Sequence, residues 1–188
     1  VTVITPVHDQ QGERLLFFTA SRAHHAEIGG IRPGSMPPFS KTLAEEGELI
    51  RNFKLIDAGT SRMDELSELL TTAPYPSRAV DDNLADIAAQ MAANQQAIRD
   101  LRMLIDRYSL PVVEAYMGHI QQAAEQKMRQ GLARLEPGTY HFVDHLDNGA
   151  RIEVRIDVAG DAATIDFTGT DPVLEDNLNA NRAIVDFQ

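Results

Sequence analysis

A short segment of this chain carries two adjacent histidines, a glutamate and two glycines, and these residue types together could form part of a metal site. If the segment continues a strand, His25 and Glu27 project to one side and His24 projects to the other. An imidazole and a carboxylate that converge in this way can bind a hard or borderline divalent ion. Gly29 and Gly30 follow at once and would let the backbone approach a ligand closely.

Two further readings of this segment stay open from the residues alone. Arg22, Arg32 and Lys41 bracket it and could bind an anionic group. Alternatively, the segment is a glycine- and proline-rich surface loop whose histidines are merely exposed. Two ligands do not make a metal site, so any further ligands would have to come from elsewhere.

A phosphate-binding loop is excluded at this position, although two glycines have the right spacing for one. Gly29 and Gly34 match the pattern, but Ser35-Met36 stands where a lysine and a serine or threonine are required. Pro37 and Pro38 also obstruct the helix that would present its N–H groups to a phosphate. We therefore expect no nucleotide site here.

Composition narrows the class of protein. The chain has 188 residues, 43% of them hydrophobic, and its 17 basic and 28 acidic residues give a net charge of −11. Such a charge disfavours binding to nucleic acid or to an anionic membrane. The absence of cysteine excludes disulfides and thiolate metal sites and fits a reducing compartment, so we expect a cytoplasmic location.

The pattern of apolar residues first predicts strands and then helices. Residues 1–7 and 14–20 are expected to pair as a hairpin, and a Gly/Pro-rich loop follows over residues 22–40. A short strand is expected at residues 53–57. A helix is expected after Ser61, which could act as its N-cap.

The helical signal is strongest in the middle of the chain. Steps of three and four residues join Leu84, Ile87, Met91, Asn94, Ile98, Leu101, Ile105 and Tyr108. A second helix is expected from Pro111 to Pro137-Gly138, and the short link between the two predicts an antiparallel helical hairpin. Asn94 is the polar exception on the stripe. We expect its amide to bond to a group outside its own helix and to fix the register of the hairpin.

The period then becomes two, which predicts an antiparallel β-meander over roughly residues 140–167 with turns at Asn148-Gly149 and Gly160-Asp161. The fold class is therefore α+β: an N-terminal β-hairpin and Gly/Pro-rich loop, a long antiparallel helical hairpin and a C-terminal β-meander. Because the chain opens on a strand pattern and closes on the apolar run 183–187, we expect residues 1–188 to be a single fragment of a domain, truncated at both ends.

Residues 22–38 resemble the signature of the hydantoinase B/oxoprolinase family. Further similar segments follow in order along the chain and extend the resemblance over essentially all of it. They are Glu45-Glu46-Gly47, Phe53-Lys54-Leu55, residues 83–86, 90–94, 115–121 and 166–170, and Asn177-Leu178-Asn179-Ala180.

The resemblance implies the hydrolytic part of an ATP-dependent enzyme that opens cyclic amides such as 5-oxoproline or N-substituted hydantoins. It implies a hydantoinase A-type partner, as a subunit or domain, that binds ATP. It also implies a divalent metal ion (Mg, Mn or Zn) with ligands at His24 and His25 and further ligands upstream of Val1. Glu27, where the family commonly has Asp, would be a ligand or general base, and Arg22 and Arg32 would bind an anionic group.

Two alternatives to this function remain. One is an acetone carboxylase-like subunit, and the other is a non-catalytic scaffold that docks a kinase-like partner. We expect residues 1–188 alone to be inactive and to bind metal weakly, because only part of the ligand set is present.

Overall fold

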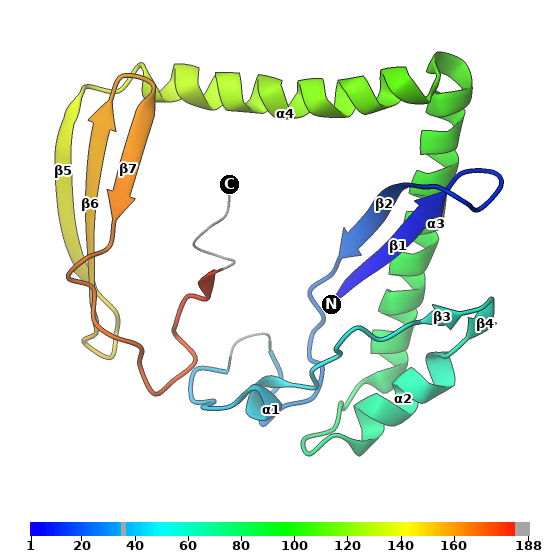
Figure 1. Cartoon of the computed structure of the whole chain (residues 1–188). Helices are drawn as coiled ribbons and strands as arrows, with labels where there is room; N and C mark the ends of the chain where they lie inside the picture. The colour runs from blue at the N-terminus through cyan, green and yellow to red at the C-terminus, as the bar shows by residue number, and fades with distance from the viewer. Residues whose placement is uncertain (35–36, 183–188) are drawn as a thin grey trace. The chain divides into compact units, whose positions relative to one another are not determined.

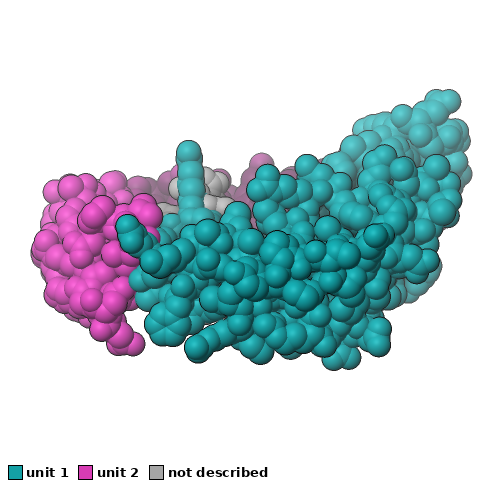
Figure 2. Space-filling view, turned by 90° about the horizontal axis from the view of Figure 1, so that it is seen from below, with its two compact units in different colours: residues 1–103, 175–188 teal, residues 104–174 magenta. Residues whose placement is uncertain are grey.

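A computed structural model describes residues 1–34 and 37–182, so the apolar run 183–187 and the pair Ser35-Met36 lie outside the described residues. The chain separates into two compact units, residues 1–103 with 175–188 and residues 104–174 (Figure 2). Helices and antiparallel sheets occupy separate stretches of sequence (Figure 1), which confirms the α+β class.

The predicted N-terminal hairpin is confirmed in the first unit. Strands β1 (Thr2–His8) and β2 (Leu15–Arg22) pair antiparallel, with Thr2 opposite Arg22. Alternation along β1 buries Val3 and Val7 and leaves the residues between them more exposed. The hairpin therefore packs one face against the core. The segment that carries the histidines begins where β2 ends.

Short elements follow in the first unit and lead to its core. They are α1 (Leu43–Glu46), the two-residue strands β3 (Ile56–Asp57) and β4 (Thr60–Ser61), and α2 (Met63–Thr72). The expected strand at 53–57 is thus limited to its last two residues. Buried residues from three elements meet in the core, namely Val3 of β1, Leu66 and Leu70 of α2, and Ile87 of the next helix.

The longest helix, α3 (Val80–Tyr108), matches the predicted stripe. Its buried residue Ile87 packs with Val3 of β1 and with Leu66 and Leu70 of α2, and Asn94 donates a hydrogen bond to β1. Figure 1 shows the hairpin alongside the helix. The sequence predicts that the following helix covers this stripe, whereas within the first unit β1 and α2 contact its buried residues. An amphipathic pattern reports that one face is buried but does not specify which element covers it.

The second unit contains α4 (Leu110–Leu132) and a three-stranded sheet. Among the described residues of α4 only Val113 is buried. Strands β5 (Gly138–His145), β6 (Arg151–Ala159) and β7 (Ala162–Asp166) pair antiparallel in that order, which confirms the meander. Gly149 and Gly160 take positive φ at the two predicted turns. Within the described part of the chain, every helix is too short or too polar to cross a membrane.

Candidate functional site

The histidine segment leaves the sheet where β2 ends. Ala23 still donates a hydrogen bond to the carbonyl oxygen of Val1, but β2 itself stops at Arg22. His24 is exposed, whereas the side chain of His25 is only 3% exposed and Glu27 is 6% exposed. The burial therefore alternates as an extended segment predicts, even though these residues belong to no strand among the described residues.

The buried carboxylate of Glu27 accepts hydrogen bonds from two segments of the chain. Its Oε2 accepts from the amide of Gly29 at 2.7 Å, and its Oε1 accepts from the hydroxyl of Ser77 at 2.6 Å. Oε1 also accepts from the amides of Arg78 and Ala79, both at 3.0 Å. These two amides directly precede α3, so the carboxylate satisfies N–H groups ahead of the helix start, where negative charge is favoured.

These contacts determine the ionisation of Glu27. Burial acts to raise the pKa of the carboxyl group, because the charged form loses solvation. The hydrogen bonds from Ser77, Gly29, Ala79 and Arg78 outweigh burial, so the pKa of Glu27 lies below its ordinary value of 4.5. Glu27 is therefore a carboxylate at neutral pH.

The two glycines hold the loop close to neighbouring backbone. Both have φ of +89°, and a Cβ atom at Gly30 would lie 2.5 Å from the carbonyl oxygen of Glu46. A Cβ atom at Gly29 would overlap the carbonyl oxygen of Tyr75, to which the amide of Gly30 donates a hydrogen bond at 3.0 Å. Glycine at both positions therefore lets the loop lie closer to the backbone of Glu46 and Tyr75 than any residue with a Cβ atom could.

His25 is the buried imidazole of the site. Its Nδ1 lies 3.3 Å from Oδ2 of Asp86, in the second turn of α3, although the angles are not those of a formed hydrogen bond. Both ring nitrogens lack a hydrogen-bond partner within residues 1–34 and 37–182. Burial lowers the pKa of His25 from its ordinary value, and the neighbouring Asp86 and Asn83 act in the opposite direction. The ring is therefore buried, and neither of its nitrogens is used in a hydrogen bond with a described residue.

The three cationic residues predicted to bracket the loop differ in their contacts in the structure. Arg22 is exposed and its Nε donates to Oγ1 of Thr2 at 3.0 Å. Arg32 lies with its guanidinium 5.8 Å from the centre of the Phe39 ring. Lys41 is exposed, and its side chain makes no hydrogen bond or ion pair with any described residue.

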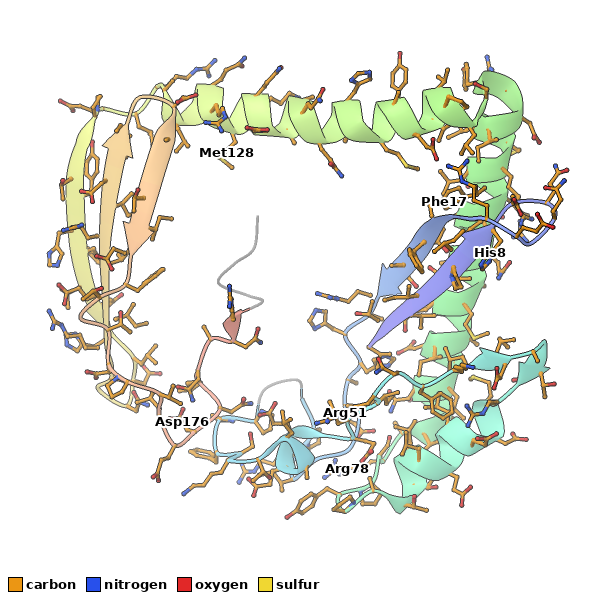
Figure 3. All side chains as sticks on the ribbon, viewed as in Figure 1. His8, Phe17, Arg51, Arg78, Met128 and Asp176 are labelled. Carbon is orange, nitrogen blue, oxygen red and sulfur yellow. The ribbon has the colours of Figure 1, made fainter. Side chains whose placement is uncertain are left out.

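Sequence reasoning missed one cationic residue at the loop. Arg78, labelled in Figure 3, donates from Nη2 to the carbonyl oxygen of Gly30 at 2.8 Å, and its Nη1 lies 3.5 Å from Oε2 of Glu27. Asn83 and Asp86 lie in the segment 83–86 that resembles the family, but sequence reasoning assigned them no role at the site. Their spacing of three residues at the start of a predicted helix was the available signal, because it places both side chains on one face.

Four of the predicted site residues line one pocket of about 300 Å³. Its walls include Arg22, His24, His25 and Glu27, with the segment 46–49 also contributing. Arg32 and Lys41 are not part of its lining. The structure therefore brings together both histidines, the glutamate and one of the predicted cations.

A metal ion fits this pocket only in part. The unbonded nitrogens of His25 suit a metal ligand, and His24 is next to it on the pocket wall. However, the described residues contain no group of three or more histidine, aspartate and glutamate side chains that could hold an ion. Residues 1–34 and 37–182 thus contain two histidine rings of a type that binds metal ions, but no full set of ligands.

Comparison with known proteins gives consistent matches. The hydantoinase B/oxoprolinase family model matches residues 1–187. The chain is 40% identical to 5-oxoprolinase 1 of Arabidopsis thaliana, over 98% of the chain and 16% of that protein. It is 39% identical to 5-oxoprolinase of Saccharomyces cerevisiae, over 98% of the chain and 15% of that protein. The chain therefore spans less than one-fifth of the length of these relatives.

A solved structure matches the fold as well. The crystal structure of ATP-dependent caprolactamase from Pseudomonas jessenii has a TM-score of 0.72 and 29% identity. The match covers 87% of this chain and 28% of that one.

Proposed function

Because this chain belongs to the hydantoinase B/oxoprolinase family, we propose that it forms part of the hydrolytic subunit or domain of an ATP-dependent cyclic-amide hydrolase. The observation that carries the proposal is the 40% identity to a 5-oxoprolinase over 98% of the chain. The similarity to an ATP-dependent caprolactamase supports the same class, since both names describe enzymes that act on a cyclic amide. The proposed substrates are 5-oxoproline or an N-substituted hydantoin.

His25 and His24 are the proposed metal ligands. The buried, unbonded ring of His25 supports this role, and His24 lies beside it on the same pocket. The chemistry that a divalent ion (Mg, Mn or Zn) supplies when bound is polarisation of a carbonyl oxygen or a lowered pKa of water. The remaining ligands would come from outside the described residues.

Glu27 is proposed to act by holding the loop in place. A general base needs a free oxygen within reach of the proton it removes. Both oxygens of Glu27 already accept hydrogen bonds, from Gly29, Ser77, Arg78 and Ala79, and these bonds lower its pKa and make it a weaker base.

Arg22 is the better candidate for binding an anionic group, because it lines the pocket and Arg32 does not. ATP is proposed to bind a hydantoinase A-type subunit or domain. Such a partner would supply the activated substrate, and the residues of this chain would hold it while the ring opens. A cytoplasmic location is part of the same proposal, since the partner and ATP would be found there.

The test uses the full-length protein together with its hydantoinase A-type partner. Ring opening of 5-oxoproline, hydantoins and caprolactam should depend on ATP, and mass spectrometry should find a divalent metal in stoichiometric amount. His25→Ala should lower metal content and kcat together. His24→Ala should do less, because His24 is exposed whereas the side chain of His25 is buried.

Each alternative has its own outcome in this test. Stoichiometric metal with ATP-dependent carboxylation of acetone, and no ring opening, would identify a carboxylase. Absence of both metal and activity would indicate a docking scaffold. Full metal content in both histidine variants would remove the metal role from this loop.

A further inference from the structure

Asp86 faces the buried ring of His25 from the second turn of α3. The carboxylate Oδ2 lies 3.3 Å from Nδ1 of the imidazole. The ring is 3% exposed, whereas the side chain of Asp86 is 55% exposed and keeps its solvation. Hydrogen bonds between site residues are often long or poorly aligned before a ligand binds, so the present angle does not remove the contact.

The distance between His25 and Asp86 depends on how α3 meets the loop. Asn83 and Asp86 are three residues apart and project from the same face of the helix. Asn83 is 3% exposed and its Nδ2 donates to Oγ of Ser77 at 2.9 Å, while Ser77 donates to Glu27. The carboxylate of Glu27 thus ties the first turn of α3 to the loop that carries His25.

A carboxylate in this place determines which nitrogen of the imidazole carries hydrogen. A neutral imidazole has one N–H donor and one bare nitrogen, and the partner of one nitrogen sets the state of the other. Ionised aspartate only accepts hydrogen bonds, so a hydrogen bond between Asp86 and Nδ1 requires Nδ1 to be the protonated nitrogen. Nε2 is then the bare nitrogen, and it has no other partner among the described residues.

We propose that Asp86 is a positioning residue that accepts a hydrogen bond from Nδ1–H of His25 and thereby presents bare Nε2 as the metal-binding atom. The inference rests on the proposed function, in which His25 is a ligand. Asp86 itself acts through the ring and does not contact the ion. Carboxylates that orient ligating histidines in this way also raise the basicity of the ring.

The first test measures the tautomer of His25 without any metal. The chain contains six histidines, which can be labelled with ¹⁵N and observed by NMR at pH 7.5. The His25 resonance is assigned by its loss in His25→Gln. Protonated Nδ1 with bare Nε2 is expected in the wild type, and Asp86→Ala should shift the ring toward the Nε2–H tautomer.

Asp82→Ala is the matched control for this substitution. Asp82 is exposed in the first turn of α3, and its carboxylate makes no hydrogen bond or ion pair with any described residue. Both variants remove one negative charge and gain the same helix propensity, so equal far-UV circular dichroism and equal thermal midpoints would show that both fold. Asp82→Ala should leave the tautomer of His25 unchanged.

The second test measures metal affinity in the full-length protein by titration with Zn²⁺ and Mn²⁺. Asp86→Ala should weaken affinity by about 10- to 100-fold, as loss of such a partner typically does, while Asp82→Ala should have no effect. His25→Ala should abolish tight binding. Asp86→Asn keeps an acceptor oxygen in place and should recover part of the lost affinity.

The outcomes distinguish failure of the positioning role of Asp86 from failure of the metal role of His25. If His25→Ala leaves metal binding intact, the proposed metal role fails whatever Asp86 does. If His25→Ala abolishes binding but Asp86→Ala changes neither tautomer nor affinity, the positioning role alone is overturned. A fully protonated His25 ring at pH 7.5 would also overturn it, because an imidazolium has no bare nitrogen.

Discussion

The side-chain amide of Asn94 donates a hydrogen bond at 3.0 Å to the carbonyl oxygen of Val3, which lies 91 residues earlier in the chain. The same Nδ2 donates to Oγ1 of Thr5 at 3.2 Å, and Asn94 is only 2% exposed. The predicted bond from Asn94 to a group outside its own helix is therefore confirmed. Its partner is β1 and not the following helix, so this amide fixes the position of β1 along α3.

Replacing Asn94 should destabilise the protein. Asn94→Ala removes the donor and leaves the buried carbonyl of Val3 without this partner, which costs about 1–3 kcal/mol. Gln95→Ala is the control, because it removes an exposed amide from the next position of the same helix. Urea unfolding followed by circular dichroism should show a lower midpoint for Asn94→Ala only. Equal midpoints for the two variants would mean that the bond adds no net stability.

Loss of the Glu27 carboxylate should also destabilise the protein. Glu27→Ala leaves Gly29, Ser77, Arg78 and Ala79 without their shared acceptor, and hydrogen bonds to a charged group are worth about 1.5–3 kcal/mol each. Because neighbouring groups relax, we expect a total loss of about 2–4 kcal/mol. Glu68→Ala, at an exposed site on α2, should change the unfolding free energy little.

The pH dependence of stability should carry the signature of Glu27. Its pKa in the folded protein lies below the ordinary value of 4.5, so the unfolded chain takes up the proton first as the pH falls. The stabilisation is then fully present above about pH 4.5 and is lost as the pH falls through the pKa of the folded state. In Glu27→Gln this part of the acid dependence should be absent. The difference in unfolding free energy from wild type should shrink between pH 6 and pH 3, and a constant difference would contradict the assignment.

Gly30→Ala should disturb the histidine loop more than the same change elsewhere. Alanine at φ of +89° costs about 1–3 kcal/mol, and its Cβ would also lie 2.5 Å from the carbonyl oxygen of Glu46. Gly12→Ala is the matched control, since Gly12 has φ of +77° and open space around its Cβ position. Thermal unfolding should show a larger loss for Gly30→Ala. Similar losses would mean that backbone strain alone matters at both sites.

The sequence by itself determined the longer elements and their order, but not the short α1 and β4. Apolar spacing of three and four residues identified α3, and spacing of two identified β1, β2 and the meander, because these periods are local properties of helix and strand geometry. The residue types of the loop also grouped His25 with Glu27, and the family resemblance added His24. The structure places all three on one pocket.

Only the tertiary structure decided what those elements face. Glu27 and Ser77 are 50 residues apart, and nothing local to either one indicates that they form a hydrogen bond. Asp86 likewise reaches His25 because the loop after β2 returns to the start of α3. Periodicity reports relations over a few residues along the chain. The partners of His25 and Glu27 depend instead on the path of a loop with glycines at positive φ. No repeating sequence pattern encodes that path, and none specifies which elements pack on the buried face of α3.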